Sequence, residues 1–152
     1  MPRPCPRLFP PDELGFREVV RLAGEIDGTA PWPPVAVGPE GTFLSATYSP
    51  GEIAEWSATG QLQRVIGNGE GSGPGESRRA QDIVIGPDSV VNIMTGGTRW
   101  HRYSPTGDFM ETVSLPTVAG AGEAIATADG TLLTWVRSRE GPQMLAWDGS
   151  DI

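Results

Sequence analysis

The histidine and the cysteine are the residues that first suggest catalysis. His101 lies in the run RWHRY, and Cys5 lies far upstream near the N-terminus. A catalytic triad or a zinc site needs several such groups at close spacing, so this pair forms neither. If RWHRY is a strand, Trp100 and Arg102 face one side, while His101 and Tyr103 face the other. We therefore expect His101 to be a packed strand residue, because no carboxylate nearby orients it as a base, and we predict no catalytic residue.

The charged residues exclude several functions. All eleven basic residues are arginine, which removes Schiff-base chemistry and the lysine of a P-loop. The net charge of −8 argues against non-specific binding of nucleic acid, which requires a basic surface. Arginine instead suits bidentate contacts with carboxylates or phosphates.

The composition indicates one all-β domain. The 152 residues can bury a real core, and 21 Gly, 15 Pro and five Trp suit short strands joined by tight turns. One cysteine makes no internal disulfide, and no run approaches the length of a membrane span. Residues 1–14 are rich in proline and have no apolar segment of a signal peptide, so we expect a flexible leader.

Three segments repeat one order of parts. Each has a short apolar run, a turn with Gly, Asp or Glu, a second apolar run, an aromatic residue and a Ser- or Asp-led turn. The copies are spaced by 48 residues (Gly41 to Ser89) and 41 residues (Ser89 to Gly130). This length fits a β-propeller blade of four strands, a to d. The predicted blades are 35–67, 83–116 and an incomplete one at 124–152.

A further fragment of the repeat lies upstream of the first copy. RLAGEIDG (21–28) matches RVIGNGEG (64–71) in the placing of Arg, Gly and the apolar pair. The overlapping run FREVVRLAG also has a helical periodicity. Because the matching run sits among strands, we predict that 15–28 is the d strand of a preceding blade.

The repeated pattern resembles the NHL-type repeats of six-bladed β-propellers. The Gly-rich exit GNGEGSGPGE (67–76) carries the resemblance most clearly, and the pattern extends over roughly residues 16–152. The Asp-x-x-Asn-x-Arg segment usual between strands b and c is not evident, since TGGTRWHRY keeps only an arginine before the aromatic residue. The resemblance implies a propeller architecture but does not specify an activity.

The strand count leaves the state of the ring open. The chain reads as one, four, four and three strands, twelve in all, which is about three blades. Three blades do not close a ring, because propellers have about four to eight. One interpretation is a piece of a longer six-bladed propeller. Another is a homodimer in which each copy donates its N-terminal d strand to close a six-bladed ring. A different all-β fold is the third alternative.

Polar residues gather in the loops that precede strand a and join strands b and c. In a propeller these loops share one rim around the central channel. We expect the loops before strand a at roughly 24–34, 67–82 and 116–123, and the loops between strands b and c at roughly 47–52, 95–99 and 136–142. Several guanidinium groups at a rim could bind an anionic ligand, or they could be solvated arginines paired with the surplus acids. The candidate ligand-binding residues are Arg79, Asp82, Arg99, Arg137 and Arg139.

Two further site types are weaker. The Gly-rich exit lacks the order of a phosphate-binding loop, so we interpret it as a flexible connection between blades. Metal binding would follow from a resemblance to gluconolactonase-like propellers with bound calcium, but only Asp82 and Glu123 precede an a strand. We therefore predict no metal site and no cofactor. If a metal does bind, calcium is the candidate. Asp88 and Asp129 fall in turns, where turn chemistry explains them.

These observations favour a non-enzymatic binding or scaffold module that recognises a protein or a small anionic ligand at the channel rim. The alternative is a fragment of a metal-dependent propeller enzyme of the lactonase or lyase type. The compartment stays unknown; the resemblance implies export in bacteria, whereas this chain shows no export signal.

Overall fold

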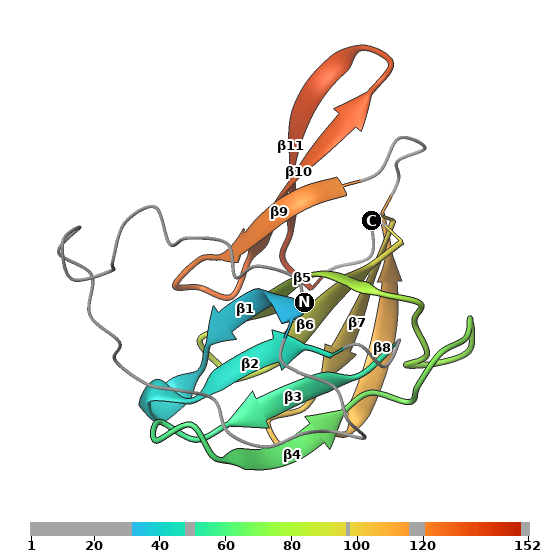
Figure 1. Ribbon diagram of the computed structural model, residues 1–152. Coiled ribbons are helices and arrows are strands. Elements are labelled where there is room, and N and C mark those ends of the chain that lie inside the picture. Colours follow the sequence, from blue (N-terminus) through green and yellow to red (C-terminus); the bar gives the residue numbers. More distant parts are fainter. Residues whose placement is uncertain (1–31, 48–50, 97, 116–120, 150–152) are drawn as a thin grey trace, which may run out of the picture.

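The computed structural model describes residues 32–47, 51–96, 98–115 and 121–149. The predicted leader 1–14 and the predicted d strand 15–28 lie outside the described residues. The described part forms eleven strands in three antiparallel sheets (Figure 1). None of its helices is long and apolar enough to cross a membrane.

Each sheet corresponds to one copy of the repeat, and we name the sheets blades 1 to 3. Blade 1 contains β1 (Trp32–Val37), β2 (Phe43–Ala46), β3 (Ile53–Trp56) and β4 (Leu62–Ile66). Blade 2 contains β5 (Ala80–Ile85), β6 (Val91–Thr95), β7 (Arg99–Tyr103) and β8 (Phe109–Ser114). Blade 3 contains β9 (Ala121–Ala126), β10 (Leu132–Ser138) and β11 (Gly141–Trp147). Neighbouring strands in each sheet are consecutive in the chain, which confirms the predicted all-β fold of up-and-down blades.

The turns close as the repeated motifs predict. In the turn after β7, the Ser104 N–H donates to the Asp108 carbonyl at 2.8 Å, and the Gly107 N–H donates back to Ser104 at 2.8 Å. Gly107 has φ +90°, a conformation that glycine adopts without strain. Between β5 and β6, the Asp88 carboxylate accepts the Val90 N–H at 3.2 Å, which confirms the turn role of this aspartate.

The core between blades 1 and 2 forms because alternate residues of each strand face the neighbouring blade. Leu44 and Ile53 of blade 1 pack in one buried cluster with Ile83 and Ile93 of blade 2. Tyr103 belongs to the same cluster and donates its hydroxyl hydrogen bond to the Gly75 carbonyl at 2.8 Å. The connection between the blades is therefore anchored to blade 2.

The core between blades 2 and 3 uses the opposite face of blade 2. Met94 and Trp100, which are 0% and 1% exposed, cluster with Leu132 of blade 3. The Arg102 guanidinium lies 4.6 Å from the centre of the Trp147 ring, a cation–π contact between the two blades. Trp100 and Arg102 thus share one face, and His101 shares the other with Tyr103, as alternation predicts.

Several strands extend further toward the rim than the sequence predicted. Asp82 lies within β5 rather than in a loop, because a bulge between Ala80 and Asp82 lets pairing continue. Arg99 is the first residue of β7. The predicted loop 136–142 is wrong at both ends, because Arg137 pairs with Pro142 and lengthens the β10–β11 hairpin.

Candidate binding site at the rim

Arg79 and Arg99 lie at the same end of blade 2. Arg79 immediately precedes β5, whose first residue Ala80 pairs with Thr95 at the end of β6. Thr95 pairs in turn with Arg99 at the start of β7. Arg79 is exposed and Arg99 is half-buried. The sheet register therefore brings these two predicted site residues to one rim.

Asp82 lies just below this rim and connects blade 2 to blade 3. Its Oδ2 accepts the Ala124 N–H of β9 at 2.7 Å, and its Oδ1 accepts the Ile83 N–H at 2.9 Å. Burial raises the pKa of Asp82, the two amides partly offset this effect, and the nearby Glu123 adds to it. Both carboxylate oxygens thus bond within the protein.

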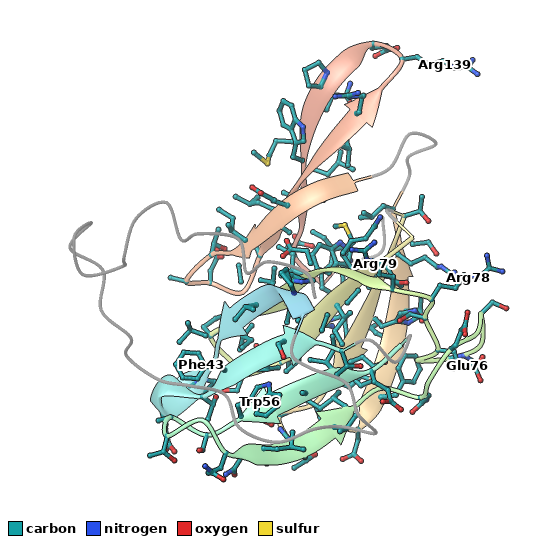
Figure 2. All side chains as sticks on the ribbon, viewed as in Figure 1. Phe43, Trp56, Glu76, Arg78, Arg79 and Arg139 are labelled. Carbon is teal, nitrogen blue, oxygen red and sulfur yellow. The ribbon has the colours of Figure 1, made fainter. Side chains whose placement is uncertain are left out.

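The arginines of blade 3 lie on its hairpin. Arg137 is exposed on β10, and Arg139 is exposed in the turn between β10 and β11. Figure 2 shows Arg139 at the tip of this hairpin, which projects away from the other two sheets, whereas Arg79 lies beside blade 2. Arg79 and Arg99 therefore lie at the same end of blade 2, whereas Arg139 lies apart from them at the tip of the blade 3 hairpin.

The ion pairs within the described residues lie elsewhere. Arg64 pairs with Glu55 in blade 1, and Arg102 pairs with Glu111 in blade 2. The rim arginines take part in neither pair. In the same part of the chain, no group of three or more His, Cys, Asp and Glu residues could hold a metal ion.

His101 is buried between blades 1 and 2. It is 1% exposed, its Nδ1 lies 2.9 Å from the Thr112 Oγ1, and its ring centre lies 6.1 Å from that of Phe109. The pKa of His101 is lowered, first because burial disfavours the charged ring and second because Arg99 repels the positive charge; the backbone of Glu76 partly offsets this. The ring is thus a neutral core group, as predicted from its strand.

A cavity that sequence reasoning missed lies at the opposite ends of the strands. It has a volume of about 400 Å³ and is lined by the turn residues Pro39, Glu40, Ser89 and Pro105 together with strand residues of blades 1 and 2. Arg64 lies on its wall, where its Nη2 donates to the Pro105 carbonyl at 2.7 Å. The repeat predicts these turns but not the hollow, because the hollow depends on how the two blades splay.

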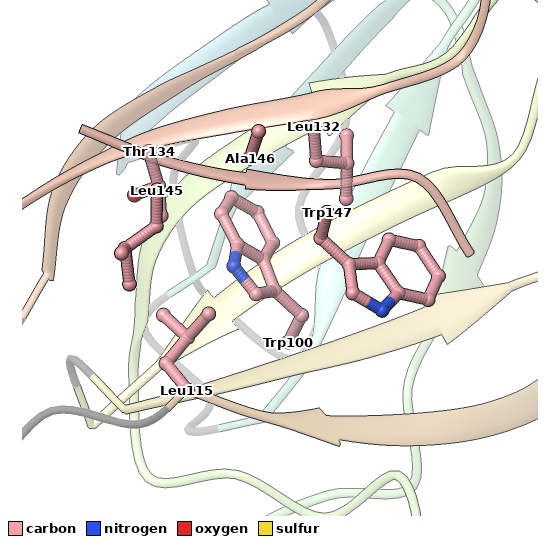
Figure 3. A pocket seen from close by; sticks show the side chains of 7 residues that line it. All are labelled: Trp100, Leu115, Leu132, Thr134, Leu145, Ala146 and Trp147. Carbon is pink, nitrogen blue, oxygen red and sulfur yellow. The ribbon is translucent and has the colours of Figure 1, made fainter. Parts of the chain in front are cut away.

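A second, smaller cavity lies between blades 2 and 3. Its volume is about 50 Å³, and Figure 3 shows the Trp100 and Trp147 rings among its side chains, with Leu132 and Leu145. Most of its lining is apolar, so it represents incomplete packing of the interface rather than a polar site.

Comparison with known proteins identifies the fold alone. No family model and no curated protein matches the sequence. Virginiamycin B lyase from Staphylococcus aureus superposes with a TM-score of 0.57 at 15% identity, over 83% of this chain and 43% of that one. U3-55K gives 0.61 at 17% identity, over 76% and 35%. The β-propeller domain of Cps50 (Swd1) from Myceliophteria thermophila gives 0.50 at 12% identity, over 80% and 41%.

This chain therefore spans less than half the length of these solved proteins. They include a lyase as well as a propeller domain named for its architecture, so the shared fold does not select an activity. The described residues form antiparallel sheets that pack face to face, as the blades of a propeller do. The chain has the β-propeller fold, and its described residues form three blades.

Proposed function

We propose that this chain is a non-enzymatic binding module whose rim arginines, led by Arg79 and Arg99, bind an anionic group. The group is a carboxylate or phosphate on a small ligand or on a protein. Arg137 extends the same rim on blade 3, and Arg139 would contact only the outer part of a larger ligand. Asp82 supports the site by holding β5 against β9.

The observation that carries this proposal is the strand register, which brings Arg79 and Arg99 to one end of blade 2. Arg79 is exposed, Arg99 is half-buried, and neither takes part in the two ion pairs of the described residues. Guanidinium groups offer forked donors that match planar or tetrahedral anions. Two other polar groups do not compete for the ligand. His101 is buried, and both carboxylate oxygens of Asp82 accept hydrogen bonds within the protein.

The proposal is tested by isothermal titration calorimetry with inorganic phosphate and with galacturonate. We expect saturable binding of at least one anion to the wild-type chain. Arg79→Ala and Arg99→Ala should each weaken it about tenfold or more, because a hydrogen bond to a charged group contributes about 1.5–3 kcal/mol. Gln63→Ala, an exposed polar residue on β4 of blade 1, is the matched control and should leave binding unchanged.

Two outcomes contradict the proposal. One is the absence of saturable binding of either anion to the wild-type chain. The other is equal loss of binding in Gln63→Ala and in the arginine variants. Thermal unfolding with added calcium tests the alternative of a metal-dependent enzyme. Calcium should raise the Tm if the chain has such a metal site, and it should leave the Tm unchanged if the chain is a binding module without one.

A further inference from the structure

The cavity of about 400 Å³ between blades 1 and 2 lies at the ends of the strands opposite the rim arginines. Pockets that hold small molecules have volumes of about 300–1,000 Å³ and combine a mostly apolar lining with a few polar groups. The buried part of this lining is apolar, since Leu44 and Val91 are 2% and 4% exposed and Ile85 is half-buried. Polar side chains of the turns complete it. The cavity therefore has the size and the composition of a ligand pocket.

Two residues of this lining have an unfavourable backbone conformation. Glu40 has φ +57° and Ser89 has φ +63°, and within the described residues these two are the non-glycine residues with positive φ. A left-handed backbone brings the Cβ of any such residue too close to a carbonyl oxygen. Both residues line this one cavity. Strained residues of this kind occur preferentially at ligand sites.

The turn of blade 2 does not itself require serine at position 89. The Ser89 N–H donates to the Gly86 carbonyl at 2.9 Å, and in blade 3 the Gly130 N–H donates to the Thr127 carbonyl at 3.0 Å. The two turns therefore close in the same way, and Gly130 has φ +90°, which glycine adopts without strain. Compared with that glycine, Ser89 adds a hydroxyl group at the wall of the cavity.

The turn of blade 1 closes differently and brings Glu40 to the cavity. Here the Thr42 N–H donates to the Pro39 carbonyl at 3.2 Å, one residue further along the repeat than in the other two turns. This shift places both Glu40 and Gly41 in the left-handed region, at φ +57° and +76°. Asp129 has the place of Glu40 in the third copy and accepts a backbone N–H of its own turn at 3.2 Å. The Glu40 carboxylate makes no such bond within the described residues.

The charges around the cavity leave one carboxylate unpaired. Arg64 and Glu55 form an ion pair on its wall, and the Arg64 Nη2 also donates to the Pro105 carbonyl at 2.7 Å. The charges of this pair cancel. Among the described residues, neither the Glu40 carboxylate nor the Ser89 hydroxyl is bonded to another group. A ligand in the cavity would therefore meet a negative charge and a hydroxyl group beside an apolar wall.

We propose that this cavity binds an organic cation, namely a protonated amine or a guanidinium on a short apolar chain. The Glu40 carboxylate and the Ser89 hydroxyl accept the N–H groups of the cation, and its carbon chain packs on Leu44, Ile85 and Val91. Free amines and the lysine or arginine side chains of a protein share this chemistry. The inference does not depend on the proposed anion site, which lies at the opposite end of the blades.

Isothermal titration calorimetry of the full chain with three probes tests this site. Agmatine and cadaverine represent free cations, and a peptide with one central lysine and capped ends represents a protein side chain. We expect saturable binding of at least one probe, with an affinity that falls as the salt concentration rises. If only the free cations bind, the ligand is a small molecule. If only the peptide binds, the ligand is the side chain of a protein.

Removal of the Glu40 charge should weaken the binding of the probe. Glu40→Gln keeps the shape of the side chain, and we expect it to raise the Kd about fivefold or more, because a charge-assisted hydrogen bond is lost. Asp129→Asn is the matched control. Asp129 is an exposed carboxylate at the same place in the repeat, but it does not line the cavity, so this variant should leave the Kd unchanged.

Replacement of Ser89 should separate binding from stability. Ser89→Gly relieves the left-handed strain, so the Tm should rise by about 2–4 °C. The same change removes the hydroxyl group, so the Kd for the cation should rise about threefold or more. A serine that served its turn alone would not produce these opposite effects. Thermal unfolding and calorimetry of the same variant measure the two quantities.

Three results would overturn the proposal. One is that no probe binds the wild-type chain with a Kd below about 1 mM. Another is an equal loss of binding in Glu40→Gln and Asp129→Asn, because the overall negative charge alone would then attract the probes. The third is a Ser89→Gly variant that binds as tightly as the wild type. Titration of Glu40→Gln with inorganic phosphate distinguishes this site from the proposed anion site, since phosphate binding should not weaken.

Discussion

At the residue scale, two buried polar side chains of β7 lie in the interface between blades 1 and 2. His101 and Tyr103 project from β7 toward blade 1, and their ring centres lie 6.1 Å and 5.8 Å from that of Phe109. The Tyr103 hydroxyl is bonded to Gly75, and burial raises its pKa to about 12. The His101 ring is held neutral by its surroundings. Both groups favour their uncharged form, and within the described residues the buried His101 Nε2 has no hydrogen-bond partner.

The lowered pKa of His101 predicts a loss of stability in mild acid. In the unfolded chain the ring titrates near 6.5. Below that pH the unfolded state takes up a proton that the folded state resists, so the free energy of unfolding falls until the pH reaches the lowered folded pKa. The slope is at most about 1.4 kcal/mol per pH unit. Urea unfolding of wild type and His101→Gln at pH 7.5 and 5.5 measures this effect.

The difference between the two proteins isolates the histidine. Asp82 has a raised folded pKa, so its contribution has the opposite sign: stability increases as the pH falls through that pKa toward 3.8. Asp82 is present in both proteins, and its contribution cancels in the comparison. If wild type and His101→Gln lose stability equally over this pH range, then His101 is not the group responsible.

At the element scale, close backbone contacts hold the Gly-rich connection between β4 and β5 in place. Gly51 has φ +77°, and a Cβ placed there would lie 1.9 Å from the Gly69 carbonyl oxygen. The Ser77 N–H donates to Gly69 at 3.0 Å, and the Asn68 side-chain N–H donates to Pro74 at 2.8 Å. The glycines therefore allow two loops of the rim to pack backbone against backbone.

Substitution of Gly51 tests this contact. Gly51→Ala should destabilise the protein by about 1–3 kcal/mol more than Gly69→Ala, because overpacking against a fixed backbone adds to the conformational strain. Gly69 is the matched control: it has φ +87°, and a Cβ there meets nothing within 4 Å. Equal losses of Tm in the two variants would show that conformation alone, not the close approach, requires glycine at this site.

Blade 2 is the centre of the whole molecule, because it is packed on both faces. Every residue of β6 is buried, whereas β11 has mostly exposed and half-buried residues and forms the edge of its sheet. Local opening needs less free energy where fewer apolar contacts are lost. The stability of the molecule should therefore decrease from blade 2 toward the end of blade 3.

Hydrogen exchange followed by mass spectrometry should show this gradient. We expect the amides of β6 and β7 to be the slowest to exchange and those of β11 to be among the fastest. Protection of β11 equal to that of β6 would contradict the gradient.

The sequence alone determined the repeat, the order of the strands and the turns that join them, because these depend on local rules. Apolar runs such as IVI and VVNIM and turns such as SPTG are specified by neighbouring residues, and the structure has them where expected. Alternation along RWHRY also predicted correctly which residues share a face.

Tertiary structure alone decided where the strands end and which polar groups are free. Asp82 reads as a loop residue until a bulge extends β5 and its carboxylate meets the Ala124 N–H of another blade. The 400 Å³ cavity and the exposure of Trp135 and Met144 likewise depend on how whole sheets lie against one another. Such contacts join residues of different blades, and no spacing within one blade encodes them.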